Sequence, residues 1–113
     1  IMQACWTMSF VIHCGACFWI YIGRHNDQGW IDNFDLADES HFVIYVHSYE
    51  YITATFTTIG YGNTYPVSVQ EKSVAHLLMV LGSIVFALVM QRVFSYKRKV
   101  TIKDEMDNRK VTA

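Results

Sequence analysis

The chain has 113 residues, of which 52% are hydrophobic and 17% are charged, and its formal net charge is −1 at pH 7. This length fits one domain, and the balanced charge gives no sign of a nucleic-acid or acidic partner. Three cysteines do not form a disulfide framework. No nucleophile and base, and no set of metal ligands, indicates an enzyme. The sequence begins at Ile1 inside an apolar run, so we expect it to be part of a longer protein.

The first predicted element is a membrane-spanning helix over residues 2–22. This stretch carries no charge when His13 is neutral, and its length matches the ~20 residues that cross a hydrocarbon layer of ~30 Å. Backbone polar groups in lipid must be hydrogen-bonded within the segment, which favours a helix. Trp19 and Tyr21 lie near its end, where aromatic side chains often anchor a helix at the membrane interface.

Two cysteines in this helix, Cys14 and Cys17, form a Cys-x-x-Cys pair beside His13. No strand precedes the pair, which argues against a thioredoxin-like motif. Residues three apart share one face of a helix and could bind a metal, but no fourth ligand follows nearby. The pattern favours small, soft side chains that pack between helices.

The segment 23–40 is polar and is predicted to form a loop. It contains one arginine, Arg24, and five acidic residues: Asp27, Asp32, Asp35, Asp38 and Glu39. Basic residues instead follow a second apolar run, at Arg92 and at 97–99. The positive-inside rule therefore predicts cytoplasmic chain ends and an extracellular loop 23–40. The acidic side chains would concentrate cations at this side, or they form a plain solvated loop.

Residues 41–56 form a shorter apolar and aromatic segment, which suits a re-entrant helix better than a full span. Ser40 is placed to cap its N-terminus. Irregular backbone at membrane depth occurs only where protein buries it or water lines it, so the loop after this helix requires neighbouring subunits. The negative end of the helix dipole, near Phe56, would favour a cation in the cavity beneath it.

Two residues within the segment 41–56 are candidates for supporting the loop that follows. Tyr51, together with Tyr49, is predicted to form an aromatic cuff whose hydroxyl groups brace the loop. Glu50 is an ionisable group at membrane depth, which makes it a functional candidate. Its possible partners are Lys72, a hydroxyl group that supports the loop, or water.

The run Thr57-Thr58-Ile59-Gly60-Tyr61-Gly62 has the pattern of a potassium selectivity filter. In potassium channels, four loops of the Thr-Val-Gly-Tyr-Gly type replace the hydration shell of the ion with rings of backbone carbonyl groups. Such a loop needs backbone angles at alternate residues that a Cβ atom opposes, which explains the two glycines. The alternative is a glycine-rich turn between two buried helices.

Each residue of this run has an expected role. The carbonyl groups of Thr58, Ile59, Gly60 and Tyr61 are predicted to coordinate dehydrated K⁺. The hydroxyl group of Thr58 would add an oxygen ligand at the inner end. The Ile59 and Tyr61 side chains would point away from the pore axis. Thr57 and, just outside the filter, Asn63 are predicted to support the filter and its outer mouth.

A second spanning helix follows, predicted at about 68–96, with Pro66 ending the loop and Ser68 as its cap. Gly82 lies in its middle, where glycine costs ~1 kcal/mol relative to alanine. It is either a hinge that lets the helix open or a point of close helix packing. Phe86 and Met90 share one face and are predicted to form the gate, the alternative being lipid or helix contact.

The order of helix, re-entrant helix, filter and helix resembles the pore module of tetrameric potassium channels. Residues 13–19 (HCGACFW) and 21–23 (YIG) resemble the outer helix of the cyclic-nucleotide-gated, hyperpolarisation-activated, ether-à-go-go-type and plant inward-rectifying branch. Residues 82–87 (GSIVFA) are similar to the inner helix of cyclic-nucleotide-gated channels. Residues 104–111 (DEMDNRKV) look like the start of their linker to a cyclic-nucleotide-binding domain.

This resemblance implies an all-α membrane protein with two transmembrane helices, a re-entrant pore helix and fourfold or pseudo-fourfold symmetry. Residues 1–96 would be the pore module and residues 97–113 the start of a cytoplasmic linker. The expected partners are three identical or homologous modules and the lipid bilayer, with a plasma-membrane location. K⁺ is the permeant ion, and cyclic nucleotide would bind only in a domain outside this segment.

Departures from the family pattern leave two rival functions open. Non-selective cyclic-nucleotide-gated channels lack the Gly-Tyr-Gly signature that this chain carries, so it looks like a potassium-selective member, as in sperm channels with four unlike repeats. Asn63 stands where many potassium channels have Asp, which lowers the charge at the outer mouth. The stretch between Phe94 and Arg109 is shorter than the usual linker. The rivals are a weakly selective cation pore and a non-conducting regulatory subunit.

Overall fold

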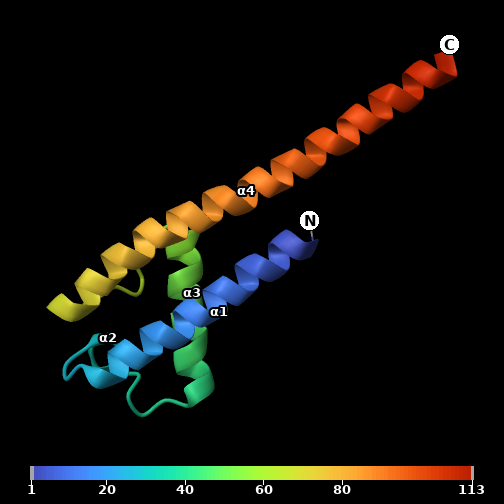
Figure 1. The fold of residues 1–113 in the computed structure, drawn as a ribbon. Helices are drawn as coiled ribbons and strands as arrows, with labels where there is room; N and C mark the ends of the chain where they lie inside the picture. The colour runs from blue at the N-terminus through green and yellow to red at the C-terminus, as the bar shows by residue number, and fades with distance from the viewer. Residues whose placement is uncertain (1, 113) are drawn as a thin grey trace.

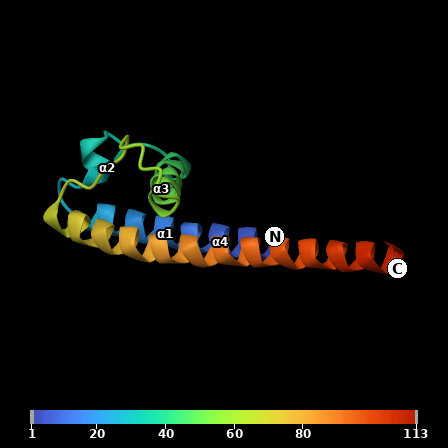
Figure 2. The ribbon, with the colours of Figure 1, turned by 90° about the horizontal axis from the view of Figure 1, so that it is seen from above.

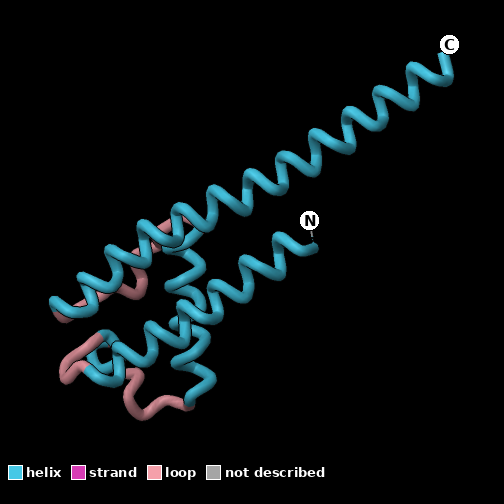
Figure 3. The backbone as a smooth tube through the Cα atoms, in the orientation of Figure 1, coloured by secondary structure: helices cyan, strands magenta, loops and turns pink. Residues whose placement is uncertain are grey.

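The computed structural model describes residues 2–112 and contains four helices in this range. They are α1 (Met2–His25), α2 (Trp30–Asn33), α3 (His41–Phe56) and α4 (Val69–Thr112). Within the described range, every other residue lies in a loop or turn (Figure 3). The all-α fold predicted from the sequence is therefore confirmed.

The two long helices run antiparallel and form one layer of the molecule (Figure 1). Both α2 and α3 lie on the same side of this layer, and α3 crosses it steeply (Figure 2). The C-terminal part of α4 extends beyond the other helices, which makes the chain 71 Å long and only 26 Å and 20 Å across. This arrangement leaves one side of the long helices uncovered in the single chain.

Both long helices are apolar and long enough to cross a membrane. α1 continues three residues past the predicted end at residue 22 and finishes with two basic residues, Arg24 and His25. Positive side chains in the last turn of a helix are stabilised by its negative dipole end. At ~1.5 Å per residue, the 44 residues of α4 span about twice the thickness of a ~30 Å hydrocarbon layer.

The long helix α4 continues without a break through residue 96, where the pore module was predicted to end. The residues beyond this point are exposed and carry most of the positive charge of the helix. Its C-terminal part therefore extends past the apolar span as a charged, solvent-facing helix. The boundary between pore module and linker stays a prediction, because the secondary structure does not mark it.

Helix α3 begins and ends at the predicted residues, 41 and 56. The Ser40 side chain accepts a hydrogen bond from the backbone N–H of Val43 over 3.4 Å, which satisfies one of the free donors of the first turn. The predicted N-cap is therefore present. The short helix α2 was not anticipated within the polar segment 23–40.

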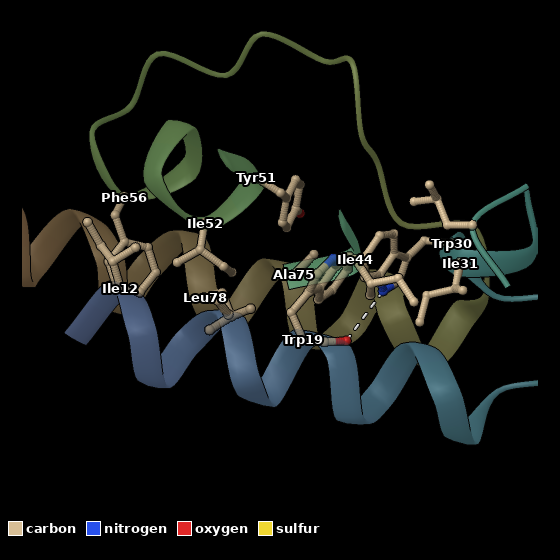
Figure 4. Close-up of a cluster of buried hydrophobic side chains, with 12 residues drawn as sticks. Ile12, Trp19, Trp30, Ile31, Ile44, Tyr51, Ile52, Phe56, Ala75 and Leu78 are labelled. Atoms are coloured by element: carbon tan, nitrogen blue, oxygen red, sulfur yellow. Dashed lines mark hydrogen bonds between the residues drawn. The ribbon is translucent and has the colours of Figure 1, made fainter. Parts of the chain in front are cut away.

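The core lies where α3 packs across the two long helices, and aromatic side chains form the part of it that lies near α2 (Figure 4). Trp19 of α1 is fully buried and stacks on both Trp30 and Tyr51, with ring centroids 5.9 Å and 4.6 Å away. The segment 23–40, which was predicted to be a loop and which we call the turret, contains α2. The prediction of Trp19 as an interfacial anchor was wrong, because α2 brings Trp30 over it. Tyr21, its neighbour in that prediction, is exposed.

Candidate functional site

The inner end of the predicted filter is held by backbone hydrogen bonds to the last turn of α3. The N–H of Thr58 donates to the carbonyl of Thr55 over 3.2 Å, and the N–H of Ile59 donates to the carbonyl of Ala54 over 3.0 Å. These two bonds, with Thr58 in the left-handed region at φ 62°, form a Schellman motif. Gly60 adds a third bond, also to Ala54. The helix end and the start of the loop thus form one hydrogen-bonded unit.

Alternate residues of the loop adopt positive φ angles, as the filter pattern requires. Thr58, Gly60 and Gly62 have φ values of 62°, 59° and 76°. A Cβ atom at either glycine would have no heavy atom within 4 Å, so the backbone angle alone favours glycine there. The sequence indicated both glycines but missed Thr58, whose β-branched side chain makes this angle costly.

The two threonines at the start of the loop direct their hydroxyl groups back along the chain. The Thr57 hydroxyl donates to the carbonyl of Thr53 over 2.7 Å, and the Thr58 hydroxyl donates to the carbonyl of Thr57 over 2.6 Å. A hydroxyl that donates one bond still has lone pairs that can accept or coordinate. The Thr58 oxygen therefore stays available as a ligand.

The outer end of the loop is bonded to α3 through side chains. The Asn63 side-chain amide donates to the Glu50 carboxylate over 2.8 Å. Lys72, one of the candidate partners of Glu50, is exposed, and no ion pair to it occurs in the described structure. The partner of Glu50 is therefore Asn63, the residue predicted to lie at the outer mouth, thirteen positions along the chain.

Tyr51 does not brace the loop within its own chain. Its ring is buried against Trp19, and its hydroxyl group has no hydrogen-bond partner among the described residues. Within the single chain, Tyr51 thus stacks its ring between α3 and α1, and a contact of its hydroxyl group with the filter stays a prediction. By contrast, Ile59 and Tyr61 are 58% and 72% exposed and have open space around them in the single chain.

The predicted hinge and gate residues lie along one side of α4. Gly82 is buried, and a Cβ atom there would clash with the Phe56 ring at the end of α3. The structure thus shows the close packing that was one of the two interpretations of this glycine. Phe86 and Met90, one and two turns further on, are half-buried. Their role as a gate stays a prediction.

Comparison with known proteins places this architecture in a family. The sequence profile of a family described as ion channel matches residues 6–99, which is most of the chain. The chain belongs to this ion channel family. It is therefore a channel segment rather than an enzyme, and its two apolar helices are those of an integral membrane protein.

Three relatives are potassium channels of plants. The chain is 34% identical over 80 residues to potassium channel AKT1 of Arabidopsis thaliana, a match that covers 65% of this chain and 9% of the relative. It is 30% identical over 80 residues to potassium channel AKT1 of two rice subspecies, with the same coverage. The matched region is thus a small part of the length of these relatives.

One buried carboxylate of the channel segment was missed at the level of sequence. Glu71, in the first turn of α4, is fully buried and accepts hydrogen bonds from three backbone N–H groups. The pattern Ser68-Val69-Gln70-Glu71 before an apolar run is a capping box, which could have indicated half of this arrangement. The other half depends on a residue 41 positions away.

The cysteines of the channel segment do not pack between the helices of this chain. Cys14 and Cys17 are exposed on α1. The ring nitrogen Nδ1 of His13 lies 2.6 Å from the Tyr45 hydroxyl oxygen of α3, and Nε2 lies 3.8 Å from the Cys17 sulfur. No group of three His, Cys, Asp or Glu residues that could hold a metal occurs within the described range.

Proposed function

We propose that this segment is one pore module of a potassium-selective channel that lets K⁺ flow down its gradient. The observation that carries the proposal is the loop from Thr57 to Gly62, which leaves the end of α3 with positive φ at every second residue. The likeness to potassium channels of plants supports the choice of ion. The carbonyl groups of residues 58–61 would replace the water shell of K⁺, with the Thr58 hydroxyl at the inner end.

The polarity of the elements around the loop suits a cation. The C-terminal end of α3 carries the negative end of the helix dipole and leads directly into Thr57. At the outer end, the carboxylate of Glu50 contacts Asn63, so a negative charge lies beside the position where many potassium channels carry Asp. This charge argues against the rival function of a weakly selective pore whose outer mouth is neutral.

The module would work as one of four around a common axis. Large apolar side chains are exposed on α1, on α4 and in the loop, and exposed patches of this kind indicate protein or lipid contacts. In the proposed assembly, three identical or homologous modules and the bilayer cover them. Residues 1–96 would be the pore module and 97–113 the start of the linker, with the segment 23–40 outside the cell and both chain ends inside.

The proposed gate is the apolar constriction formed by Phe86 and Met90 from each module, which closes by excluding water. Both side chains are half-buried in the single chain. This suits residues that partly contact a neighbouring helix and partly face the pore. Cysteines introduced at these two positions should react with thiol reagents from the cytoplasm only when the channel is open. Equal reactivity in both states would place the constriction elsewhere.

The proposal also includes modulation of the full-length channel by cyclic nucleotides. Cyclic-nucleotide modulation rests on the likeness of residues 82–87 and 104–111 to cyclic-nucleotide-gated channels. The sensor would lie outside this segment. We expect the full-length protein to lie in the plasma membrane and to be a potassium-selective member of this branch. Its four modules would be identical subunits or four unlike repeats of one chain.

The reversal potential of the full-length channel tests the ion selectivity. With high K⁺ inside and a mixture of K⁺ and Na⁺ outside, a potassium-selective pore gives a reversal potential that follows the K⁺ equilibrium potential as external K⁺ is exchanged for Na⁺. A value near zero in mixed solutions would instead support a weakly selective cation pore. Assembly at the membrane without any current would support a non-conducting regulatory subunit.

A further inference from the structure

The carboxylate of Glu71 joins two segments that the sequence separates by almost the whole pore region. Its Oε1 atom accepts from the backbone N–H of Trp30, the first residue of α2, over 3.0 Å. Its Oε2 atom accepts from the backbone N–H groups of Val67 and Ser68 over 2.9 Å and 3.2 Å. Glu71 is the one buried charged residue in the described part of the chain, and these donors take the place of water around it.

Helix capping explains only one of the two carboxylate oxygens. The Ser68 hydroxyl accepts from the N–H of Glu71 over 3.2 Å, and Oε2 accepts from the N–H of Ser68, which completes a capping box. A capping box needs no contact with another element. The bond from Oε1 to Trp30 therefore has a different role, which is to fasten the turret to the start of α4.

Trp30 carries this connection into the core. It is fully buried, its indole N–H donates to the carbonyl of Trp19 over 3.3 Å, and its ring stacks on Trp19, which in turn stacks on Tyr51 of α3 (Figure 4). The site has no room for larger groups, because a Cβ atom at Gly29 would clash with Oε1 of Glu71. The carboxylate thus fits closely against the start of α2, and Trp30 connects it to α1 and, through Trp19, to α3.

The chain that leaves the filter is consequently fixed at two points. Asn63 is bonded to Glu50 of α3, and Val67 and Ser68 are bonded to Glu71. Only three residues, 64–66, lie between Asn63 and Val67, so the two anchored points are joined by a short connection.

We propose that Glu71 is a positioning residue for ion selectivity. It touches no permeant ion and acts by holding the segment 63–68 against the turret. The inference rests on the proposed potassium-selective function of the same loop. When the connection is released, the outer carbonyl rings lose their spacing, so Na⁺ permeates more readily and conduction fails during sustained opening.

The substitution Glu71→Gln separates this role from helix capping. Glutamine supports a capping box through its carbonyl oxygen, but its NH₂ group then faces the N–H of Trp30, where it cannot accept. In the full-length channel, we expect Glu71→Gln to lower the K⁺-over-Na⁺ permeability ratio by about tenfold or more, the scale of one charge-assisted hydrogen bond. High external K⁺ should slow the loss of current, because bound ions favour the conducting filter.

Two matched control variants leave the hydrogen bond between Glu71 and Trp30 in place. One removes an equal charge elsewhere in the segment 23–40, and the other weakens the helix cap. Glu39→Gln removes an exposed carboxylate of the turret, and Ser68→Ala removes the hydroxyl acceptor of the cap while the N–H donor remains. Both should keep the permeability ratio of the unmodified channel. Gly29→Ala, which pushes on Oε1 from the opposite side, should reproduce the Glu71→Gln defect in milder form.

The outcomes distinguish the inference from the proposed function. If the unmodified channel is not selective for K⁺, the proposed function fails. If it is selective and Glu71→Gln or Gly29→Ala, present at the cell surface as tetramers, keeps the same ratio, the positioning role fails. Should Glu71→Gln not reach the surface, Gly29→Ala alone decides. A defect in Ser68→Ala equal to that of Glu71→Gln would reduce Glu71 to a helix cap.

Discussion

The two ends of the predicted filter are held by different kinds of interaction. At the inner end, backbone hydrogen bonds of a Schellman motif join Thr58 and Ile59 to α3, and Phe56 packs against Gly82 of α4. At the outer end, the carboxylates of Glu50 and Glu71 hold the chain through Asn63, Val67 and Ser68. The inner end is therefore fixed by geometry and volume, whereas the outer end is fixed by charge.

This difference predicts which substitutions each end tolerates. Backbone bonds and apolar contacts respond to added volume or to forbidden backbone angles and are insensitive to salt. Bonds to carboxylates respond to a change of charge or of donor, and an exposed pair such as that of Glu50 is weakened by ionic screening. Variants at the two ends should therefore fail in distinguishable ways.

The largest effect is expected from Gly60→Ala, which tests the geometric control of the filter. Its φ of 59° costs a residue with a Cβ atom about 1–2 kcal/mol in each chain, and the cost recurs in every module of the assembly. We expect selective K⁺ current to be abolished in electrical recordings. Ile59→Val, which changes a side chain and leaves the backbone angle accessible, is the control and should conduct. A selective current through Gly60→Ala would refute the proposed filter conformation.

A smaller effect is expected from Gly82→Ala, which tests the packing of the inner end. The added methyl group meets the Phe56 ring, and overpacking of this kind costs about 1–3 kcal/mol. We expect lower conductance and a less stable assembly in detergent, both partly restored by Phe56→Leu. If the glycine is instead a hinge, Gly82→Ala reduces opening, selectivity is kept, and Phe56→Leu gives no recovery.

The smallest effect concerns charge at the outer end. Sequence alone predicts that Asn63→Asp raises inward current by attracting cations, most strongly at low ionic strength. In the structure, however, the new carboxylate faces that of Glu50 in place of a donor, so the bond at 2.8 Å is lost. We now expect a less stable conducting state, by less than about 1 kcal/mol in each chain because the pair is exposed.

The double variant Glu50→Gln with Asn63→Asp sharpens this test. It restores a donor and an acceptor with the roles exchanged and keeps the total charge of the unmodified chain. Recovery of stable single-channel current in the double variant, over a series of salt concentrations, would show that the bond matters. A current that depends only on the charge at position 63, and shrinks with added salt, would leave the bond without a role.

Much of the fold was accessible from the sequence because its signals are local. The apolar runs predicted α1 and α4, the cap at Ser40 and the length of the following segment predicted α3, and the pattern of glycines predicted the unusual angles at Gly60 and Gly62. Each of these features depends on residues within a few positions of one another. Hydrogen bonds within helices and the preferences of glycine act at that range.

The tertiary structure alone decided the partners of buried and polar side chains. Trp19 looked like an interfacial residue until α2 placed Trp30 upon it, and Glu50 had three possible partners, none of which was Asn63. Glu71 was missed altogether: a capping box with Ser68 could have indicated one of its oxygens, but the other binds a residue 41 positions away. Apolar periodicity specifies which face of a helix is buried, whereas the direction of each polar contact depends on how the helices cross.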